Sequence, residues 1–221
     1  MLYQQFDRCI ILDTIMRQRG ESAATFRQFL NNLADGKVTE DQWKYLCSRE
    51  LNVLSPEERE LFDNGLKLCS KNSMLKEHNI KHIKRLGTPV AAISSFNTGY
   101  GSMATSSLAG GLHKNTLLAK GQRVYLTSNE WKDAGLVNGA RGTVVGIVYR
   151  EGCQPPNLPD FTLVQFDNYI GPSCLEGMER IVPICPVTRN WISRKVPSTR
   201  TMIPLCPAYA MSIHKSQVTT L

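Results

Sequence analysis

Residues 208–217 read Ala-Tyr-Ala-Met-Ser-Ile-His-Lys-Ser-Gln, and this stretch decides how the fold is interpreted. Its first half is small and apolar, as in a buried strand, and its second half gathers four polar side chains where the chain should turn. Ligands of open α/β sheets bind outside the carboxyl ends of the strands, where such side chains can donate hydrogen bonds to phosphate. On the residues alone, a strand end that binds no ligand is the more common case.

Patterns before this stretch predict an α/β fold. Apolar runs at 9–13, 66–70 and 89–95 are typical of buried strands, and residues 71–86 between the last two have the pattern of a basic amphipathic helix. The alternation of strand and helix indicates a parallel sheet.

Three further helices are predicted in the first third of the chain. Apolar residues at helical spacing over 26–33 indicate one helix, with Gly36 placed where it would stop. Thr39 is a candidate N-cap for a second helix, and Ser55 followed by proline begins a third.

After residue 121 the pattern becomes β-rich. The runs QRVYLTS, GTVVGIVYR, FTLVQFDN and RIVPICPV are separated by loops that contain glycine or proline, and Asn138-Gly139 is a strong turn signal. Several short strands in about 60 residues predict a small barrel. The Gly/Ser-rich loop 98–112 before this region is predicted to be mobile.

Charge is distributed unevenly along the chain. The net charge is +7, but residues 1–65 carry 8 Lys/Arg against 11 Asp/Glu, whereas residues 66–221 carry 18 against 8. From residue 181 onward there are five basic residues and no acid. This distribution suits a phosphate-backbone ligand, although a basic surface without a partner is an equal alternative.

The seven cysteines are widely spread and form no C-x-x-C pair, which disfavours a disulfide framework or a zinc site. A metal set of Cys174, Cys185, Cys206 and His214 fits no compact ligand loop, so free thiols in a reducing cell interior are expected. No stretch approaches the roughly 20 apolar residues of a membrane span, and the first residues do not resemble a secretion signal. An intracellular chain without a membrane partner is therefore expected, nuclear if its source is eukaryotic, and it could be a fragment.

The stretch SIHKSQ after a small apolar strand resembles motif V of the Pif-type DNA helicases, including those encoded by Helitron transposons. Other stretches match in the family's order. DTIMRQRGE followed by FRQFLNNLADGKVTEDQWKYLCSR resembles motif IV and the helices after it. LCSKNSMLKEHN resembles the Thr-Asn-x-x-Val-x-x-x-Asn segment, and LAKGQRVYLTSN with GLVNGARGTVVG resembles the strand and turn that lead into an inserted barrel. The resemblance covers nearly the whole chain.

The resemblance implies a helicase with two RecA-like domains that hold ATP between them while single-stranded DNA crosses both. This chain resembles the second domain, over 1–145 and 203–221, with a small SH3-like all-β barrel inserted at 146–202. The first domain would carry the G-x-x-x-x-G-K-[ST] loop and the acidic Mg²⁺ motif, neither of which this sequence contains. ATP and Mg²⁺ would therefore be bound mainly by that missing N-terminal domain, and the chain alone is expected not to hydrolyse ATP.

The resemblance also implies roles for single residues. Arg17 matches the motif IV arginine that reaches the γ-phosphate, although a surface ion pair with Asp13 or Glu21 is the alternative. The nucleotide cleft would further receive Gln18, Lys215 and Gln217. DNA contacts are expected from Lys71, Asn72, Asn138, Arg141, His214 and Ser216. Base stacking by Phe96 or Tyr100 is conceivable, with ordinary loop packing as the better alternative.

Two positions depart from the family pattern. Val218 stands where the family has glycine after motif V, and Lys71 stands where it usually has threonine. A β-branched residue is costly at positive φ, so Val218 implies a different turn or a copy that has drifted. Two alternatives to a 5′-to-3′ helicase part therefore stay open: a free-standing basic module that binds single-stranded nucleic acid, and an inactive transposon-derived remnant.

Overall fold

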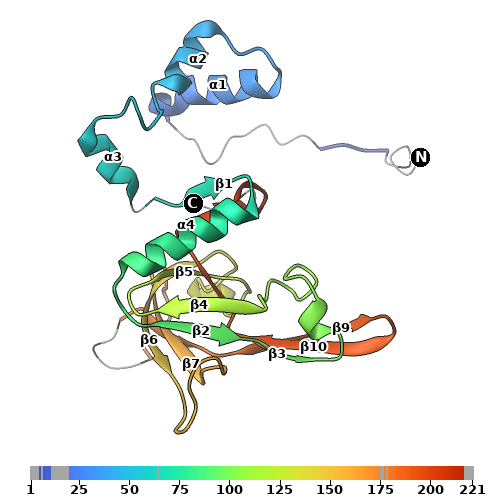
Figure 1. Ribbon diagram of the computed structural model, residues 1–221. Coiled ribbons are helices and arrows are strands. Elements are labelled where there is room, and N and C mark those ends of the chain that lie inside the picture. The colour runs from blue at the N-terminus through green and yellow to red at the C-terminus, as the bar shows by residue number, and fades with distance from the viewer. Residues whose placement is uncertain are drawn as a thin grey trace. The chain divides into compact units, whose positions relative to one another are not determined.

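The computed structural model describes residues 5, 7–10, 20–63, 65–174, 177 and 179–216. The chain divides into two compact units, Met1–Asp63 and Asn64–Leu221. The described part of the first unit is helical, and the second unit combines helices with strands (Figure 1).

Capping residues set where two helices of the first unit, α2 and α3, begin. The bounds are η2 Glu21–Ala23, α1 Ala24–Ala34, α2 Glu40–Cys47 and α3 Pro56–Asp63. The Thr39 hydroxyl accepts the Gln42 N–H at 3.3 Å, and the Gln42 side chain accepts the Thr39 N–H at 3.1 Å. Ser55 and Glu58 form the same reciprocal pair at the start of α3. The predicted helices and both predicted starts are thus confirmed.

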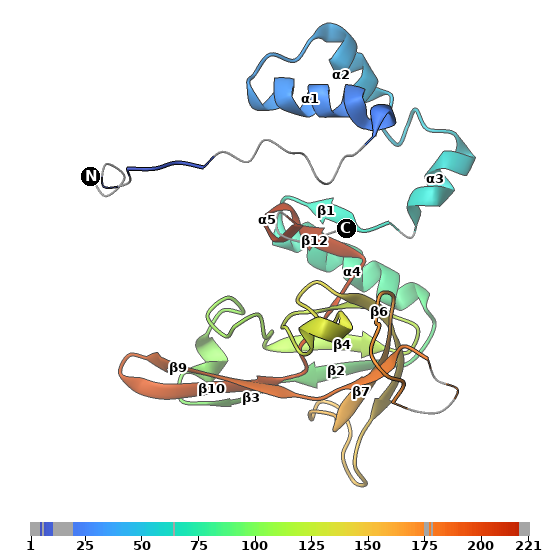
Figure 2. The same cartoon turned by 180° about the vertical axis from the view of Figure 1, so that it is seen from behind.

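A parallel strand pair and a helix form one part of the second unit. β1 (Lys67–Cys69) pairs in parallel with β12 (Ala210–Ser212), and α4 (Asn72–Arg85) follows β1 and packs against both strands. The short helix α5 (Ile213–Ser216) continues directly from β12 (Figure 2). The strand predicted at 66–70 and the helix predicted at 71–86 are confirmed as β1 and α4, and the parallel partner of β1 is β12.

Antiparallel strands form the largest sheet, in the order β11–β5–β6–β7–β8. The bounds are β5 Arg123–Leu126, β6 Arg141–Val148, β7 Phe161–Phe166, β8 Ile181–Ile184 and β11 Leu205–Pro207. Before β6 the chain turns at Gly139, whose φ of 96° favours glycine. The predicted Asn138-Gly139 turn and the β-rich segment are therefore confirmed.

Two smaller sheets complete the second unit. They contain β2 (Val90–Ser94) with β4 (Asn115–Ala119), and β3 (Phe96–Thr98), β9 (Val187–Ser193) and β10 (Val196–Met202) in the order β3–β10–β9. The β9–β10 hairpin extends as an arm beyond the other strands in both views (Figures 1 and 2). The strand predicted at 89–95 is present as β2, but it pairs antiparallel with β4 and not within a parallel sheet. The segment between β2 and β4 contains β3 and a folded loop, and no crossover helix of the kind that parallel strands require is described there.

The Gly/Ser-rich loop 98–112 is anchored, whereas its composition predicted mobility. Ala109 and Leu112 in this loop are fully buried. Arg200 of β10 is also fully buried, and its guanidinium donates to main-chain carbonyl oxygens of the loop at 2.6–2.8 Å, those of Gly101, Ala104 and Leu112. The loop sequence alone could not reveal an anchor that lies about 90 residues further along the chain.

One apolar core lies among the antiparallel strands, and a smaller cluster joins them to β12. The larger core includes Ile93, Leu118, Leu126, Val164, Phe166, Met202 and Leu205. The smaller cluster consists of Tyr125, Cys206, Ala208 and Met211, with Leu66 and Leu75 packed against it. The parallel pair is therefore attached to the five-stranded sheet through few apolar side chains.

The predicted boundaries of the insertion stay a prediction. Residues 146–202 contain β7, β8, β9, β10 and the end of β6, but the five-stranded sheet also contains β5 and β11, which lie outside that range. Residues 11–13 of the predicted first strand lie outside the described residues. Among the described helices, none is both long and apolar enough to span a bilayer.

Candidate nucleic-acid interface

Parallel pairing brings two distant sets of predicted site residues to one edge. Cys69 at the end of β1 is in register with Ser212 at the end of β12. β1 then leads through Ser70 and Lys71 into α4, and β12 leads into α5. Because the carboxyl ends of parallel strands meet at the same edge, Lys71 and Asn72 lie at the same edge as His214, Lys215 and Ser216. We call these five residues the β1–β12 edge.

The β1–β12 edge is rich in exposed polar groups. Lys71, Asn72 and His214 are exposed, and Ser216 is half-buried with its hydroxyl donating to the Ile213 carbonyl at 2.7 Å. The N-cap of α4 is Lys71, whose side chain makes no capping hydrogen bond. The first-turn N–H groups of α4 thus carry the partial positive charge of a helix N-terminus beside a lysine and a histidine. This arrangement suits an anionic ligand.

Asn79 of α4 fixes the position of β12, and its role was missed in the sequence. Its side-chain oxygen accepts the N–H groups of Tyr209 (3.1 Å) and Ala210 (2.9 Å), and its amide donates to the Ala210 carbonyl (3.3 Å). Asn79 is 5% exposed. It is the last asparagine of the LCSKNSMLKEHN segment, so the signal was present in the motif although no role was attached to it.

Lys215 connects α5 to the five-stranded sheet. Its ammonium lies 3.1 Å from the Tyr125 hydroxyl and 4.2 Å from the centre of the Tyr125 ring. Burial lowers the pKa of Lys215, and burial raises the pKa of the neighbouring Cys206 thiol to about 11. The thiol is therefore neutral at pH 7, and the lysine contacts an aromatic ring and a hydroxyl.

The other two predicted DNA contacts lie at the entry to β6. Arg141 is the cross-strand partner of Tyr125, so both side chains lie on the same face of the sheet as the Tyr125–Lys215 contact. Asn138 lies in the preceding turn, where its main-chain N–H donates to the Asn129 side chain at 2.8 Å. The structure thus brings Arg141 toward the β1–β12 edge and gives the Asn138 main chain a turn contact.

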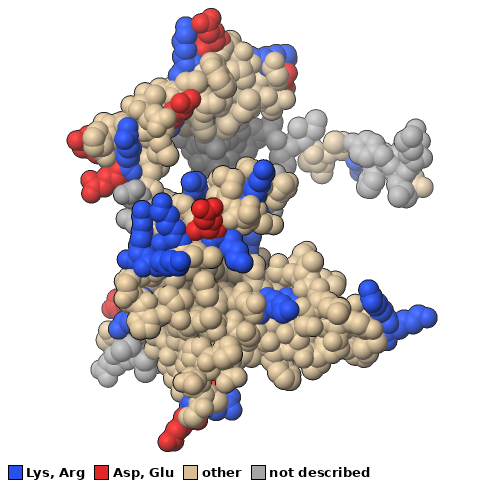
Figure 3. All heavy atoms as spheres, in the orientation of Figure 1, with Lys and Arg blue, Asp and Glu red and all other residues tan. Residues whose placement is uncertain are grey.

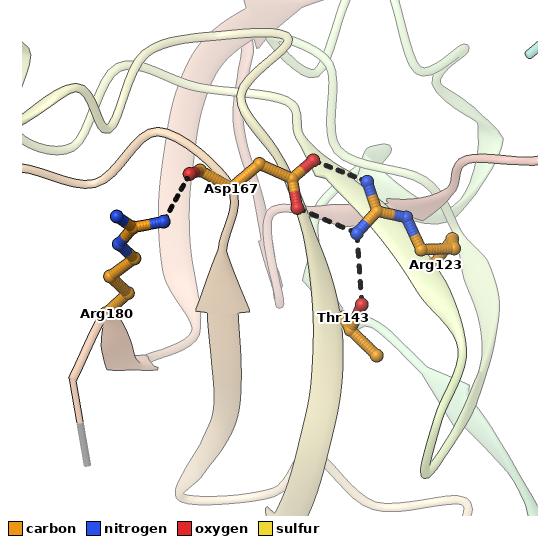
Figure 4. Close-up of polar contacts among 4 residues, drawn as sticks. All are labelled: Arg123, Thr143, Asp167 and Arg180. Atoms are coloured by element: carbon orange, nitrogen blue, oxygen red, sulfur yellow. Dashed lines mark hydrogen bonds and ion pairs between the residues drawn. The ribbon is translucent and has the colours of Figure 1, made fainter. Parts of the chain in front are cut away.

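Close to Arg141, Asp167 accepts hydrogen bonds from two other arginines. The Asp167 carboxylate accepts two hydrogen bonds from Arg123, at 2.8 and 2.5 Å, and Arg180 donates to the Asp167 carbonyl at 3.3 Å (Figure 4). The hydrogen bond from Arg123 is the main reason that the pKa of Asp167 is lowered, and Arg141 adds to the effect. Arg123 is therefore partly neutralised by this pair, which leaves Arg141 as the more suitable of the two for a phosphate.

Basic side chains also line α4. Its exposed cations are Lys71, Lys76, Lys81, Lys84 and Arg85, against one acid, Glu77, and Figure 3 shows blue side chains gathered over this helix. The pKa of His78 on the same helix is lowered, mainly by burial and further by the neighbouring positive groups His82, Lys67, Lys81 and Arg85. The exposed face of α4, which begins at the β1–β12 edge, is thus locally positive, as a polyanionic ligand requires.

Three predicted site residues lie outside the described residues: Arg17, Gln18 and Gln217. Val218, the departure from the family pattern, lies there too. All seven cysteines are free, and the described residues contain no group of three or more His, Cys, Asp or Glu able to hold a metal ion.

Comparisons with known proteins find similarity to helicases. No protein-family model matches it. It is 26% identical to an ATP-dependent DNA helicase PIF1 of Danio rerio over 97% of the chain, which corresponds to 30% of that protein. A crystal structure of Pif1 helicase from Candida albicans matches with a TM-score of 0.66 and 25% identity, over 94% of this chain and 48% of that one.

The similarity in fold extends to a solved structure with lower sequence identity. A crystal structure of Pif1 helicase from Bacteroides in complex with ADP-AlF3 and ssDNA matches with a TM-score of 0.58 and 20% identity, over 94% of this chain and 43% of that chain. The chain thus spans less than half the length of the relatives it matches. By sequence and by fold, the chain is similar to Pif1 helicases, and the similarity covers one part of such a protein.

Proposed function

We propose that the chain is the C-terminal part of an ATP-dependent 5′-to-3′ DNA helicase and that its β1–β12 edge contacts single-stranded DNA. The observation that carries this proposal is the parallel β1–β12 register, which joins Lys71 and Asn72 to His214 and Ser216 at one exposed edge. The homology to Pif1 helicases and the local positive charge around α4 support it.

The chemistry of the edge suits a sugar–phosphate backbone. The first-turn N–H groups of α4 and the Lys71 ammonium would attract a phosphate, and the Asn72 amide and the His214 ring would donate hydrogen bonds. Arg141 would add a cation from the adjoining sheet. All of these groups can contact the sugar–phosphate backbone without hydrogen bonds to the bases, so binding with little sequence preference is expected.

We further propose that ATP and Mg²⁺ are held by another domain and that this chain completes the nucleotide site. Arg17 would supply a permanently charged fork to the transferred phosphoryl group, with Gln18, Lys215 and Gln217 beside it. Because Lys215 contacts Tyr125 in the structure, it would also connect this cleft to the five-stranded sheet. We keep the RecA-like assignment of 1–145 and 203–221, with an inserted SH3-like barrel at 146–202, as part of the proposal.

A direct test measures binding of a fluorescent oligothymidylate to the complete chain as salt is raised. Binding should weaken with salt, with a slope of about −0.7 for each phosphate contact. Lys71→Ala should weaken binding by about 1 kcal/mol and reduce the slope by one contact, because it removes a cation from the edge. Lys120→Ala, which removes an exposed lysine from the turn after β4, is the matched control and should change neither quantity.

Two results would contradict the proposal. Binding that does not respond to salt, or equal effects of Lys71→Ala and Lys120→Ala, would remove the β1–β12 edge from the DNA path. ATP hydrolysis by the purified chain would contradict the assignment of the nucleotide pocket to another domain.

A free-standing binding module is the second candidate. It is favoured by the concentration of basic residues in 66–221. Both candidates predict the same DNA affinity. They differ when the chain is mixed with a Pif1-type N-terminal domain: only a helicase part should raise that domain's DNA-dependent ATP hydrolysis.

A further inference from the structure

The β9–β10 hairpin presents two cations at its tip. Arg194 and Lys195 occupy the turn with φ of 50° and 64°, the pair of left-handed conformations found in tight hairpin turns. Both side chains are exposed, and Figure 3 shows blue side chains at the end of the arm. Since residues 181–221 contain no acid, no carboxylate of the hairpin itself offsets this charge.

Tyr100 lies against this tip because the chain on both sides of it lies directly on β10. A Cβ at Gly99 would come within 2.5 Å of the Pro197 carbonyl oxygen, and one at Gly101 within 2.1 Å of the Thr199 carbonyl oxygen. The Tyr100 N–H donates to the Ser198 hydroxyl at 3.0 Å. The backbone at Tyr100 therefore has a fixed position on the hairpin.

Tyr100 and Arg194 border a small open pocket. The Arg194 guanidinium carbon lies 5.5 Å from the centre of the Tyr100 ring. The pocket has a volume of about 230 Å³ and is lined by Tyr100, Met103, Ala104, Thr105, Leu108, Ser193 and Arg194. Met103 and Leu108 are 78% and 54% exposed, so the lining offers apolar surface to a ligand. This volume lies below the roughly 300–1,000 Å³ of pockets for drug-sized ligands and suits one flat group.

Buried Arg200 holds this pocket in shape. It donates to the carbonyl oxygens of Gly101 and Ala104, which flank Met103, and to the Asn97 side chain at 3.1 Å. Burying a charged guanidinium is costly, and the described hydrogen bonds of Arg200 that offset this cost all go to neutral oxygens, mostly in the loop that carries Tyr100. The loop is ordered before any ligand arrives, which favours binding.

We propose that the Tyr100–Arg194 pocket binds one base of a single-stranded nucleic acid, while Arg194 and Lys195 neutralise the adjoining phosphates. An aromatic ring beside cations and apolar side chains is the combination that stacks a base without reading its sequence. This contact lies on the hairpin, apart from the β1–β12 edge, and it rests on the proposed function because it needs a nucleic acid bound to this chain. The hairpin would then make a second contact with the same nucleic-acid strand, in addition to the contact at the β1–β12 edge.

The test compares an oligothymidylate of about 16 nucleotides with an abasic sugar–phosphate oligomer of equal length, both measured on the complete chain. Tyr100→Ala should weaken oligothymidylate binding by about 5- to 50-fold, because a stacking partner is lost. The same variant should leave binding of the abasic oligomer unchanged. Arg194→Ala should weaken binding of both oligomers, since it removes a phosphate contact.

The chain offers a matched control on α2. Tyr45 there also lies under an arginine, Arg49, at 5.8 Å, but in the acidic first unit. Tyr45→Ala should change neither oligomer's binding, and Tyr100→Phe should keep most of the stacking. An unchanged thermal melt of Tyr100→Ala, followed by circular dichroism, shows that the variant is folded.

The outcomes separate this inference from the proposed function. If the unmodified chain binds no oligonucleotide, the proposed function fails and the inference with it. If the chain binds but Tyr100→Ala matches Tyr45→Ala, or weakens both oligomers equally, the inference alone is overturned. A folded Tyr100→Ala variant with base-dependent loss of binding supports it.

Discussion

The parallel pair with α4 and the antiparallel sheets around it are held in different ways. The antiparallel sheets share a large apolar core, in which Ile93, Leu118 and Leu126 are fully buried. The parallel pair depends on one buried amide, Asn79, and on a small cluster around Tyr125 and Met211. The region whose sequence resembles helicase motifs is thus the one with the fewer apolar contacts, which is typical of a part that moves on a rigid frame, here the antiparallel sheets.

Arg200→Met should give the largest loss of stability, and it tests how the antiparallel sheets are held together. The change removes four hydrogen bonds and leaves the buried carbonyls of Gly101, Ala104 and Leu112 without this donor. We expect a loss of about 3–5 kcal/mol in the free energy of unfolding, measured in urea. Hydrogen exchange should speed up in loop 99–112 and leave Ala210 of β12 nearly unchanged.

Arg194→Met is the matched control for this prediction. It removes an exposed arginine from the same hairpin and should change stability by no more than about 0.5 kcal/mol. If both variants lowered the free energy of unfolding equally, or if Arg200→Met also speeded hydrogen exchange at β12, the antiparallel sheets and the parallel pair would not be held independently.

Asn79→Ala should have the second-largest effect and act on the parallel pair. The Tyr209 and Ala210 N–H groups lose their acceptor, and we expect a loss of about 2–3 kcal/mol. Hydrogen exchange at these two amides should speed up while β6 and β7 remain protected. Asn72→Ala, on the exposed first turn of the same helix, is the control. If hydrogen exchange at the β6 amides speeds up together with exchange at Ala210, the two regions unfold as one cooperative unit and the prediction is contradicted.

The Arg123–Asp167 pair should contribute least, because it lies at the half-exposed face between the two regions. The side chains are 35% and 40% exposed, so we expect no more than about 1 kcal/mol. The folded pKa of Asp167 is lowered, so this stability is present above its ordinary pKa of 3.8 and is lost as pH falls through the folded pKa. The difference in unfolding free energy between the unmodified chain and Asp167→Asn should therefore shrink below about pH 4. A difference that stays constant from pH 7 to pH 3 would contradict this assignment.

Local patterns allowed much of the secondary structure to be predicted. Thr39 and Ser55 marked helix starts because their hydroxyls accept N–H groups three residues later, a contact set by near neighbours alone. The turn at Asn138-Gly139 and the alternating strands of the β-rich segment were predicted for the same reason. The antiparallel pairing of β2 and the anchoring of loop 98–112 depend on partners far along the chain, and both differed from the prediction.

The candidate site divides in the same way. Lys71, Asn72, His214, Lys215 and Ser216 could be named from motif resemblance, because motif letters are local. That they meet at one edge depends on the parallel β1–β12 register, which joins residues about 140 positions apart. The motif contained Asn79 but did not reveal which strand it holds, and the contact between Lys215 and Tyr125 could not be predicted from the sequence.

The sequence by itself determined the helix starts, the β-rich segment, the uneven charge and the likeness to a helicase family, since each rests on residues close together in the chain. Only the tertiary structure decided which strands pair, which arginine is buried, and which tyrosine lies beside the cations of the hairpin. Strand pairing and burial are set by packing between distant segments, and local propensity contains no information about those partners.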